Sequence, residues 1–418
     1  MAVAHLDELG RRAKRASREL ALAPGAAKNA ALAGAADLVS DRRDLILAAN
    51  ATDVERAERS DTPAAVIDRL RLSPSRVGAM AGGLRQVAAL PDPVGEVVDG
   101  WVRPNGLEIR RVRVPLGVVG IIYENRPNVT SDAAGLCVKA GNAAFLRGSS
   151  AAISSNQAIA GVLREGFSKA GLPDDAVVLV DDTSRESAVE FMRLDASIDC
   201  LIPRGGPSLI AAVKANATVP FVIDGDGNCH VYVDASADLA MAVDIVVNGK
   251  TQRPSVCNAT ESLVVHRSVA DPFLRRLVPA LDGVALVGDA AAQGIVGSDR
   301  MAEATDADHR SEYLDLKLSV KVVDSVDAAI EHVTRFGSGH TEAIVTSDLA
   351  TAQRFVREVD AAAVVVNAST RFTDGEQFGF GAEIGISTQK LHARGPMGLR
   401  ELTTTKYVIT GSGQIRQH

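Results

Sequence analysis

Aromatic residues are scarce in this chain: phenylalanine, tryptophan and tyrosine make up 4% of its 418 residues, and Trp101 is the single tryptophan. Its cores must therefore be filled by Ala, Val, Leu and Ile, which favours layered α/β packing over an aromatic-rich β-sandwich. At roughly 100–200 residues per domain, the length predicts two or three domains. We expect an α/β protein with more than one core.

Cysteine is also sparse. The four cysteines stand far apart, at Cys137, Cys200, Cys229 and Cys257. Without a CxxC pair or a His/Cys cluster, the sequence supports neither a zinc site nor a disulfide framework, so we expect no metal. The first residues lack the apolar core of a signal peptide, and no apolar run reaches membrane length. These absences predict a cytoplasmic protein with no membrane partner.

The chain has no excess of basic residues, since 45 Lys and Arg face 52 Asp and Glu, for a net charge of −7. Such a balance gives no general attraction to phosphate backbones, and we expect no nucleic-acid partner. With 46% hydrophobic and 23% charged residues, the composition is that of a folded globular protein and excludes disorder as the dominant state.

The amino-terminal part of the chain reads as helices over residues 7–60, where apolar residues recur at helical spacing. Residues 97–114 predict two strands that meet at Pro104-Asn105-Gly106, because Asn-Gly between strand formers is a strong hairpin signal. An isolated hairpin is only marginally stable, so this one should lie against another domain or a partner subunit.

From residue 115 short apolar runs alternate with helical stretches, which predicts parallel sheets covered on both faces. In the first series we expect strands at 118–123, 143–147, 177–180, 198–202 and 222–224, and helices at 150–170, 184–194 and 207–217. In the second series we expect strands at 230–234, 261–266, 318–323, 342–346 and 363–367, and helices at 237–249, 271–281, 326–335 and 349–358. Two open α/β domains account for the length, and residues 403–409 read as a late strand.

Three turns follow apolar strands of the first series, within 115–130, 139–150 and 202–208. Ligands of open α/β sheets collect at such carboxyl ends. The second turn reaches Ser149 and Ser150 at a helix start and the third carries Gly205 and Gly206, so both offer groups suited to a phosphate or a ribose. Serine is also an ordinary N-cap, each turn alone could be plain surface, and none matches GxGxxG. Together they indicate a nucleotide site.

Cys257 lies in Gln252–Thr260, after a long predicted helix and before a strand. A lone cysteine is most often a small buried hydrophobe. Polar and basic neighbours favour a reactive thiolate instead. No histidine stands at a recognisable partner spacing, so the residues alone leave both interpretations open.

Seven stretches together resemble the aldehyde dehydrogenase superfamily, and most closely its acyl-phosphate branch. They are Pro115–Thr130, Lys139–Gly148, Gly227–Asp234, Gln252–Ala259, Val366–Gly375, Phe380–Thr388 and His392–Met397. One departure is informative: ordinary members carry a glutamate base in an E-L-G-G-K motif, where this chain has Asp224–His230. Hydrolysis of a thioester needs such a base to activate water, whereas phosphate is already a charged nucleophile and needs none. Asp224 or Asp226 could in principle act as the base. The departure therefore fits phosphate as the acyl acceptor.

The resemblance implies that NADPH reduces L-glutamyl 5-phosphate to L-glutamate 5-semialdehyde and phosphate, the second step of proline biosynthesis from glutamate. It implies that Cys257 is the nucleophile and forms a thioester. An asparagine amide should support the acyl oxygen together with the Cys257 backbone N–H. Asn125, placed as N-x-P, is the first candidate, and Asn128 is the second.

For the cofactor, the resemblance implies contacts along one turn and at two further places. The residues concerned are Arg147, Gly148, Ser149 and Ser150, with Gly205 and Gly206 at the pyrophosphate and Glu312 at the nicotinamide ribose. NAD-preferring members often carry a glutamate where this chain has Ser150. An acid there would repel a 2′-phosphate, and Arg147 with the two serines would attract it, so we expect NADP.

For the substrate, the resemblance implies residues that read the glutamyl charges. The candidates are Arg126, Ser369, Thr370 and Arg371, with Arg253 nearer the leaving phosphate. Each arginine could equally be a structural ion-pair partner. Two rival functions also stay open: oxidation of another semialdehyde to an acid, and a non-catalytic binding role.

The expected domains follow the same resemblance. Residues 1–96 and 115–225 form the NADP-binding domain, 226–399 the catalytic domain with Cys257, and 97–114 with 400–418 a small β element for oligomerisation. We expect a homodimer or a dimer-based tetramer. A transient contact with glutamate kinase, the upstream enzyme, stays open.

Overall fold

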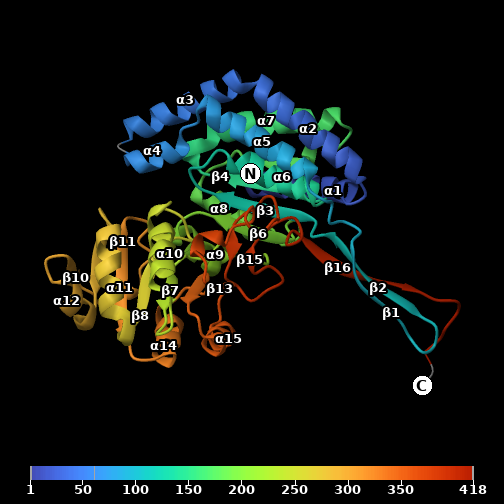
Figure 1. The fold of residues 1–418 in the computed structure, drawn as a ribbon. Coiled ribbons are helices and arrows are strands. Elements are labelled where there is room, and N and C mark those ends of the chain that lie inside the picture. Colours follow the sequence, from blue (N-terminus) through green and yellow to red (C-terminus); the bar gives the residue numbers. More distant parts are fainter. Residues whose placement is uncertain (1, 61, 417–418) are drawn as a thin grey trace. The chain divides into compact units, whose positions relative to one another are not determined.

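The computed structural model describes residues 2–60 and 62–416 (Figure 1). The chain divides into two compact units. The first comprises Met1–Ile223, Phe380–Gly385 and Met397–His418, and the second Asp224–Gly379 and Ile386–Pro396. The predicted catalytic segment 226–399 thus differs from the second unit, because residues 380–385 and 397–399 belong to the first.

Helices open the first unit, as the spacing over 7–60 predicts. They are α1 (Ala2–Leu20), α2 (Gly25–Asp41), α3 (Arg43–Arg59), α4 (Ala64–Leu70) and α5 (Pro74–Ala89). Helix α2 packs against α5 and against α7 (Ile153–Lys169). A Cβ at Gly166 of α7 would lie 2.7 Å from the Cα of Ala35, so small residues let these two helices touch backbone to backbone.

A four-stranded parallel sheet forms the centre of this unit, in the order β5-β4-β3-β6. Its strands are β3 (Val118–Tyr123), β4 (Ala143–Gly148), β5 (Val177–Leu179) and β6 (Cys200–Arg204), and the connecting helices are α6 (Val129–Lys139), α7, α8 (Arg185–Phe191) and α9 (Pro207–Asn216). Every residue of β3 and β4 is buried, as expected for a sheet covered on both faces.

The predicted strand at 222–224 is wrong. Leu201 of β6 exchanges backbone hydrogen bonds with Pro220 and Val222, and Phe221 forms only an isolated bridge to it. The next residue of β6 that would donate on this side is Pro203, which has no N–H. Pairing therefore stops after one bridge, and β6 is the edge of the sheet.

The second unit contains a seven-stranded parallel sheet, in the order β10-β9-β11-β8-β7-β12-β13. Its strands are β7 (Cys229–Val233), β8 (Thr260–His266), β9 (Ala285–Gly288), β10 (Met301–Glu303), β11 (Lys317–Val323), β12 (Thr341–Val345) and β13 (Ala363–Val366). Its helices are α10 (Leu239–Thr251), α11 (Arg267–Ala280), α12 (Ala290–Val296), α13 (Asp306–Arg310), α14 (Val326–Phe336) and α15 (Leu349–Glu358).

Alternation along β7 divides the core of this unit in two. Val231 and Val233 pack with α10 and α11, while Tyr232 packs with α14 and α15 on the other face. The strands and helices predicted for this region are present. The sequence did not predict β9, β10, α12 and α13, because three- to seven-residue elements are too short to show a period.

The predicted hairpin and tail form a separate antiparallel sheet in the first unit. Its order is β1 (Val97–Val102), β2 (Glu108–Pro115) and β16 (Thr403–Thr410). In Figure 1 these strands extend as a ribbon away from the helices of their unit. Buried Asn142 ties the ribbon's base to the parallel sheet, since its Oδ1 accepts from Gly117 N–H and its Nδ2 donates to the Leu402 carbonyl, each at 2.8 Å.

A fully buried ion pair joins α10 to β8 in the second unit. Lys250 Nζ lies 2.5 Å from Glu261 Oε2, neither side chain is exposed, and Glu261 Oε1 accepts from Leu314 N–H at 3.1 Å. Burial raises the pKa of Glu261 to about 7 and lowers the pKa of Lys250. Each charge is thus held in the interior by its partner.

We expect Glu261→Gln to lower the free energy of unfolding by about 3–5 kcal/mol, because it leaves the Lys250 ammonium buried without its counter-charge. The double variant Lys250→Met, Glu261→Leu should recover most of that loss. Arg275→Ala, which breaks an exposed pair with Asp271, is the control and should cost at most about 1 kcal/mol. Urea unfolding measures all three, and a wild-type midpoint for Glu261→Gln would contradict the assignment.

Candidate active site

Cys257 lies in the turn between α10 and β8, at the amino-terminal end of a central strand, and is half-buried. Gly227 packs directly on it: a Cβ at Gly227 would lie 1.5 Å from the Cys257 carbonyl oxygen. No side chain fits there, so the Gly227 backbone fixes the position of the Cys257 backbone.

Hydrogen bonds also hold the turn that contains Cys257. The thiol of buried Cys229 donates to the Cys257 carbonyl oxygen at 3.2 Å. The neighbouring side chain of Asn258 donates to the Thr373 carbonyl at 2.9 Å, which links the turn to the 369–373 loop. The turn is therefore held by backbone and side-chain bonds on both sides of Cys257.

Two predicted substrate residues, Ser369 and Thr370, are buried and bonded within this framework. Ser369 Oγ accepts from the Arg371 N–H at 3.3 Å, and Thr370 Oγ1 lies 3.1 Å from the Thr260 hydroxyl. The structure shows both hydroxyls in positions that shape the loop. Contact of either hydroxyl with a substrate stays a prediction.

Two guanidinium groups give the Cys257 region positive charge. Arg371 Nε donates to Gln252 Oε1 at 2.8 Å, and Arg253, the next residue, is exposed. Burial, followed by the charge of Arg253, lowers the pKa of Arg371, whereas Asp374, Cys257 and Cys229 act in the opposite direction. Arg371 thus interacts electrostatically with both Arg253 and the Cys257 thiol, and its positive charge favours an anion there.

Glu312 is bonded to the glycine that fixes Cys257. Its Oε1 accepts from Gly227 N–H at 2.8 Å, and burial raises its pKa, with a further rise from Asp226 and Asp224. Asp224 Oδ1 accepts from Ile386 N–H at 2.7 Å, and Asp226 is exposed. The structure thus brings Glu312 to the Cys257 turn, and its expected contact with a ribose stays a prediction.

The other predicted catalytic residues belong to the first unit. Asn125 follows β3 with a φ of +39°, a left-handed conformation that asparagine tolerates better than most residues. The hydroxyl of Ser149, beyond the neighbouring strand β4, donates to Asn125 Oδ1 at 3.1 Å and accepts from the Asn125 N–H at 3.4 Å. Because Oδ1 is already an acceptor, the amide nitrogen of Asn125 is the group oriented to donate.

Asn128 lies at the start of α6, and its side-chain amide is hydrogen-bonded within that helix. Its Nδ2 donates to Asp132 Oδ2 at 2.8 Å, one turn further along the helix. Exposed Arg126 lies between the two asparagines in sequence. The Asn128 amide nitrogen thus already has an acceptor, and contact of either asparagine with an oxyanion stays a prediction.

The predicted cofactor residue Arg147 is 9% exposed in strand β4. Its guanidinium donates to the carbonyls of Thr183 and Ser184, at 2.8 and 2.7 Å, and burial lowers its pKa. It therefore holds the loop between β5 and α8. A contact of Arg147 with a 2′-phosphate stays a prediction.

Asp53 of α3 fills the first turn of α7, next to Gly148–Ser150. The carboxylate is completely buried and accepts from Ser155 N–H and Oγ–H at 2.8 and 2.7 Å and from Ser154 N–H at 3.2 Å. These amides are thus unavailable to a phosphate. Sequence reasoning missed Asp53 because nothing local links it to a turn about a hundred residues further on.

The Gly205–Gly206 turn holds a carboxylate at the start of α9. Gly206 N–H donates to Glu124 Oε2 at 3.0 Å, and a Cβ at Gly205 would lie 2.7 Å from that carboxylate. An anionic oxygen thus already occupies the place where a pyrophosphate oxygen is expected, and the absence of a Cβ makes the room. Contact of this turn with a pyrophosphate stays a prediction.

A family model described as the aldehyde dehydrogenase family matches residues 2–315, more than half of the chain. The chain belongs to the aldehyde dehydrogenase family. This confirms the predicted superfamily and its two open α/β domains.

Curated relatives identify the branch of the aldehyde dehydrogenase family. Gamma-glutamyl phosphate reductase from Caldanaerobacter subterraneus is 54% identical over 97% of this chain and 98% of its own length. The Moorella thermoacetica enzyme of the same name is 56% identical, over 98% of each chain. A crystal structure of gamma-glutamyl phosphate reductase from Thermotoga maritima is 48% identical with a TM-score of 0.96, over 98% of this chain and 99% of that one. These likenesses confirm the resemblance to the acyl-phosphate branch.

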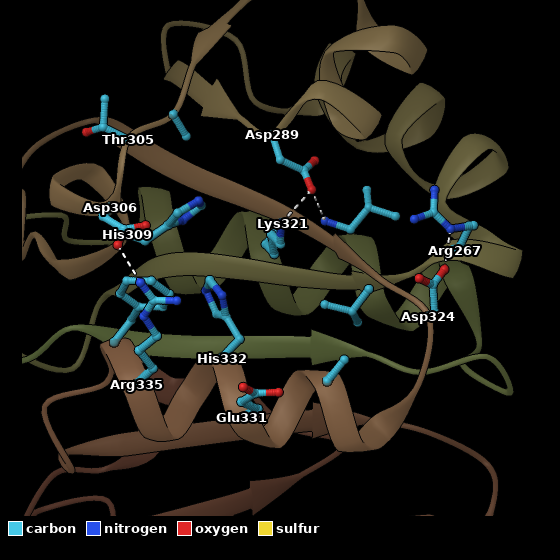
Figure 2. A pocket seen from close by; sticks show the side chains of 15 residues that line it. Arg267, Asp289, Thr305, Asp306, His309, Lys321, Asp324, Glu331, His332 and Arg335 are labelled. Carbon is cyan, nitrogen blue, oxygen red and sulfur yellow. Dashed lines mark hydrogen bonds and ion pairs between the residues drawn. The ribbon is translucent and has the colours of Figure 1, made fainter.

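Figure 2 shows a pocket of about 500 Å³ in the second unit, which contains none of the residues selected from the sequence. Three ion pairs line it: Arg267–Asp324, Lys321–Asp289 and Arg335–Asp306. Burial lowers the pKa of His332 to about 2, so this side chain is neutral at ordinary pH. The lysine and the two arginines that line this pocket are thus each paired with a carboxylate.

Within residues 2–60 and 62–416, no group of three His, Cys, Asp or Glu side chains could hold a metal ion. Across the same residues, no helix is long and apolar enough to cross a membrane.

The four thiols should differ in reactivity. Burial raises the pKa of Cys200 to about 12 and also raises the pKa values of Cys137 and Cys229, whereas Cys257 is half-buried. We expect iodoacetamide at pH 7 to label Cys257 at least about tenfold faster than the other three. Peptide mapping by mass spectrometry measures the rates, with Cys257→Ala as the control. Equal labelling of all four would contradict this order.

Proposed function

We propose that this chain reduces L-glutamyl 5-phosphate to L-glutamate 5-semialdehyde with NADPH and releases phosphate, the second step of proline biosynthesis from glutamate. The observation that carries the proposal is a half-buried cysteine, Cys257, that interacts electrostatically with Arg371, in a chain whose curated relatives are named gamma-glutamyl phosphate reductase. The substrate joins a leaving phosphate to an electrophilic carbonyl, and these residues suit both parts.

The first step is acyl transfer to sulfur. The Cys257 thiolate attacks the acyl carbon, the carbon–oxygen bond to phosphorus breaks, and phosphate leaves with the bonding electrons. Arg371 favours the thiolate, because its positive charge interacts with Cys257, and we assign the leaving phosphate to Arg371 and Arg253. The product is a thioester on Cys257.

The acyl oxygen becomes negative during this attack and needs donors. We assign that role to the Cys257 backbone N–H and the Asn125 amide. Support for Asn125 comes from the Ser149 hydroxyl, which occupies Oδ1 and so orients the amide nitrogen as a donor. Asn128 serves α6 through Asp132 instead.

NADPH, when bound, supplies the hydride that reduces the thioester carbon. Gly205 and Gly206 would receive its pyrophosphate after the Glu124 carboxylate withdraws from Gly206 N–H. The Gly148–Ser150 turn would receive the adenosine ribose, and Glu312 the nicotinamide ribose. After reduction the carbon–sulfur bond breaks, the aldehyde carbonyl forms, and Cys257 returns as thiolate.

The absence of the usual glutamate base favours this reaction over oxidation to an acid. In its region Asp224 is bonded to Ile386 N–H, and Gly227 is packed on Cys257. The missing motif glutamate supports phosphate as the acceptor in the reverse direction, and the alternative that Asp224 or Asp226 acts as the base is decided by the phosphate test below. The rival function, oxidation of another semialdehyde, requires such a base.

The reverse reaction tests the proposal. Glutamate 5-semialdehyde and NADP should yield NADPH only when inorganic phosphate is present, followed at 340 nm. Cys257→Ser should keep the fold and retain below about 1% of turnover, because a serine hydroxyl is scarcely ionised at neutral pH. Cys137→Ala removes another thiol, one that is buried and has no proposed role in the reaction; it is the control and should stay active.

Two results would end the proposal. NADPH formation without phosphate, with glutamate as product, would support the oxidising rival. Wild-type turnover by Cys257→Ser would remove the thioester route.

The two asparagines can be separated by substitution. Asn125→Ala should lower kcat by about 10²–10³-fold, the usual cost of losing one oxyanion donor. Asn128→Ala should leave kcat unchanged and cost about 0.5–2 kcal/mol of stability at most, since it removes a contact at a helix start. Steady-state kinetics and thermal unfolding check both, and the reverse ranking would assign the oxyanion to Asn128.

We further propose that the chain forms a homodimer or a dimer-based tetramer through the β1-β2-β16 sheet. Both edge strands of this sheet carry exposed apolar side chains, with Trp101 40% and Tyr407 59% exposed and their rings in edge contact. Open strand edges with apolar side chains are surfaces that proteins normally cover.

A chain ending at Thr403 should lose association, because β16 is gone. A chain ending at Gly411 keeps β16 and is the matched control. Light scattering at micromolar concentration should show a smaller species only for the first. A monomeric wild type, or identical masses for both truncations, would contradict the assignment.

We also propose the cytoplasm as the compartment, since Cys257 must stay a thiol to act and all four cysteines are thiols here. A transient contact with glutamate kinase stays a prediction.

A further inference from the structure

Arg56 of helix α3 lies at the turn assigned to the cofactor. Its Nη1 donates to the Ser150 carbonyl at 3.2 Å, and its Nη2 to Ser154 Oγ at 3.5 Å. Its side chain is 49% exposed. A guanidinium therefore approaches Gly148–Ser150 from a helix that sequence reasoning did not connect with the cofactor.

The ion pair of Arg56 with Asp53 does not account for this position. Asp53 Oδ1 lies 3.2 Å from Arg56 Nη1, but its carboxylate is already held by three donors from Ser154 and Ser155 at the start of α7. A carboxylate at a helix N-terminus with three donors is stable without a further cation. Arg56 has five N–H donors, and its exposed part can therefore bind another anion.

The other groups at this turn that could bind a phosphate already have hydrogen-bond partners. The first amides of α7 are filled by Asp53, and the Arg147 guanidinium is bonded to the carbonyls of Thr183 and Ser184. Ser150 is exposed and carries no charge that would repel a phosphate. Arg56 is thus the cation that reaches this turn with its side chain half in solvent.

We propose that Arg56 is the specificity-determining residue for the 2′-phosphate of NADPH. This rests on the proposed use of NADPH and on its adenosine ribose lying at Gly148–Ser150. A planar guanidinium pairs with phosphate through two parallel hydrogen bonds, and NADH offers it only a ribose hydroxyl. The residue therefore stabilises one cofactor and is nearly neutral for the other.

Binding of nucleotide fragments gives a direct test without turnover. Calorimetry with adenosine 2′,5′-bisphosphate and with 5′-AMP measures what the 2′-phosphate contributes in the full-length protein. Arg56→Ala should weaken binding of the bisphosphate at least about tenfold and leave 5′-AMP unchanged. Arg56→Lys, which keeps the charge without the fork, should recover part of the loss.

Steady-state kinetics should agree with the binding data. Arg56→Ala should raise KM for NADPH at least about tenfold. The kcat with NADPH, and both kcat and KM with NADH, should stay within twofold of the wild type. The matched control is Arg59→Ala, on the same helix, whose arginine pairs with Glu55 at 3.2 Å. It should behave as the wild type in every assay.

Two outcomes would overturn the inference, and only one of them would also overturn the proposed use of NADPH. If the wild type prefers 2′-phosphorylated ligands and Arg56→Ala keeps that preference, only the role of Arg56 is wrong. If the wild type shows no preference, the proposed choice of NADPH is wrong as well, and the role of Arg56 falls with it.

Discussion

The backbone contact between Gly227 and Cys257 is the constraint on which the second unit's site depends. No atom larger than hydrogen fits at Gly227 Cα on that side, so the segment before β7 lies against the turn before β8. Glu312 holds Gly227 from one side, and the Cys229 thiol holds the Cys257 carbonyl from the other. The position of the Cys257 backbone thus follows from backbone packing at the amino ends of two central strands.

Carboxylates play a comparable part in the first unit, where two helix starts follow the parallel strands. Asp53 permanently fills the start of α7, since it is buried and bonded three times. Glu124 accepts from Gly206 N–H at the start of α9. The two helix starts therefore differ for a phosphate: the start of α7 is closed by a buried carboxylate with three donors, whereas the carboxylate at the start of α9 is held there by the Gly206 N–H.

The proposed chemistry depends on which reactive and charged groups the chain has and which it lacks. The proposed chemistry needs a nucleophile, a place for the leaving group and donors for the acyl oxygen, and we assign these roles to Cys257, to Arg371 with Arg253, and to Asn125. The chain lacks the glutamate motif that ordinary family members use to activate water. This absence favours phosphate over water as the acceptor of the acyl group.

The sequence by itself determined a large part of this account. Apolar runs with intervening helical periods marked most strands of both parallel sheets, and Asn105-Gly106 marked the hairpin, because these signals are local. Motifs distributed along the whole chain determined the family and singled out Cys257 and Asn125. Very short elements such as β9 and β10 escaped, since three or four residues show no period.

Only the tertiary structure decided which groups are already in use. Val222–Asp224 has the composition of a strand, but its neighbour β6 lacks an N–H at Pro203, so no ladder continues there. Arg147 resembles a cofactor ligand in the sequence and is bonded to two carbonyls in the fold. Ser149 meets Asn125, and Arg56 meets Ser150 from 94 residues away. Local patterns report what a residue can do, whereas hydrogen-bond partners brought together by folding determine which of its groups remain to do it.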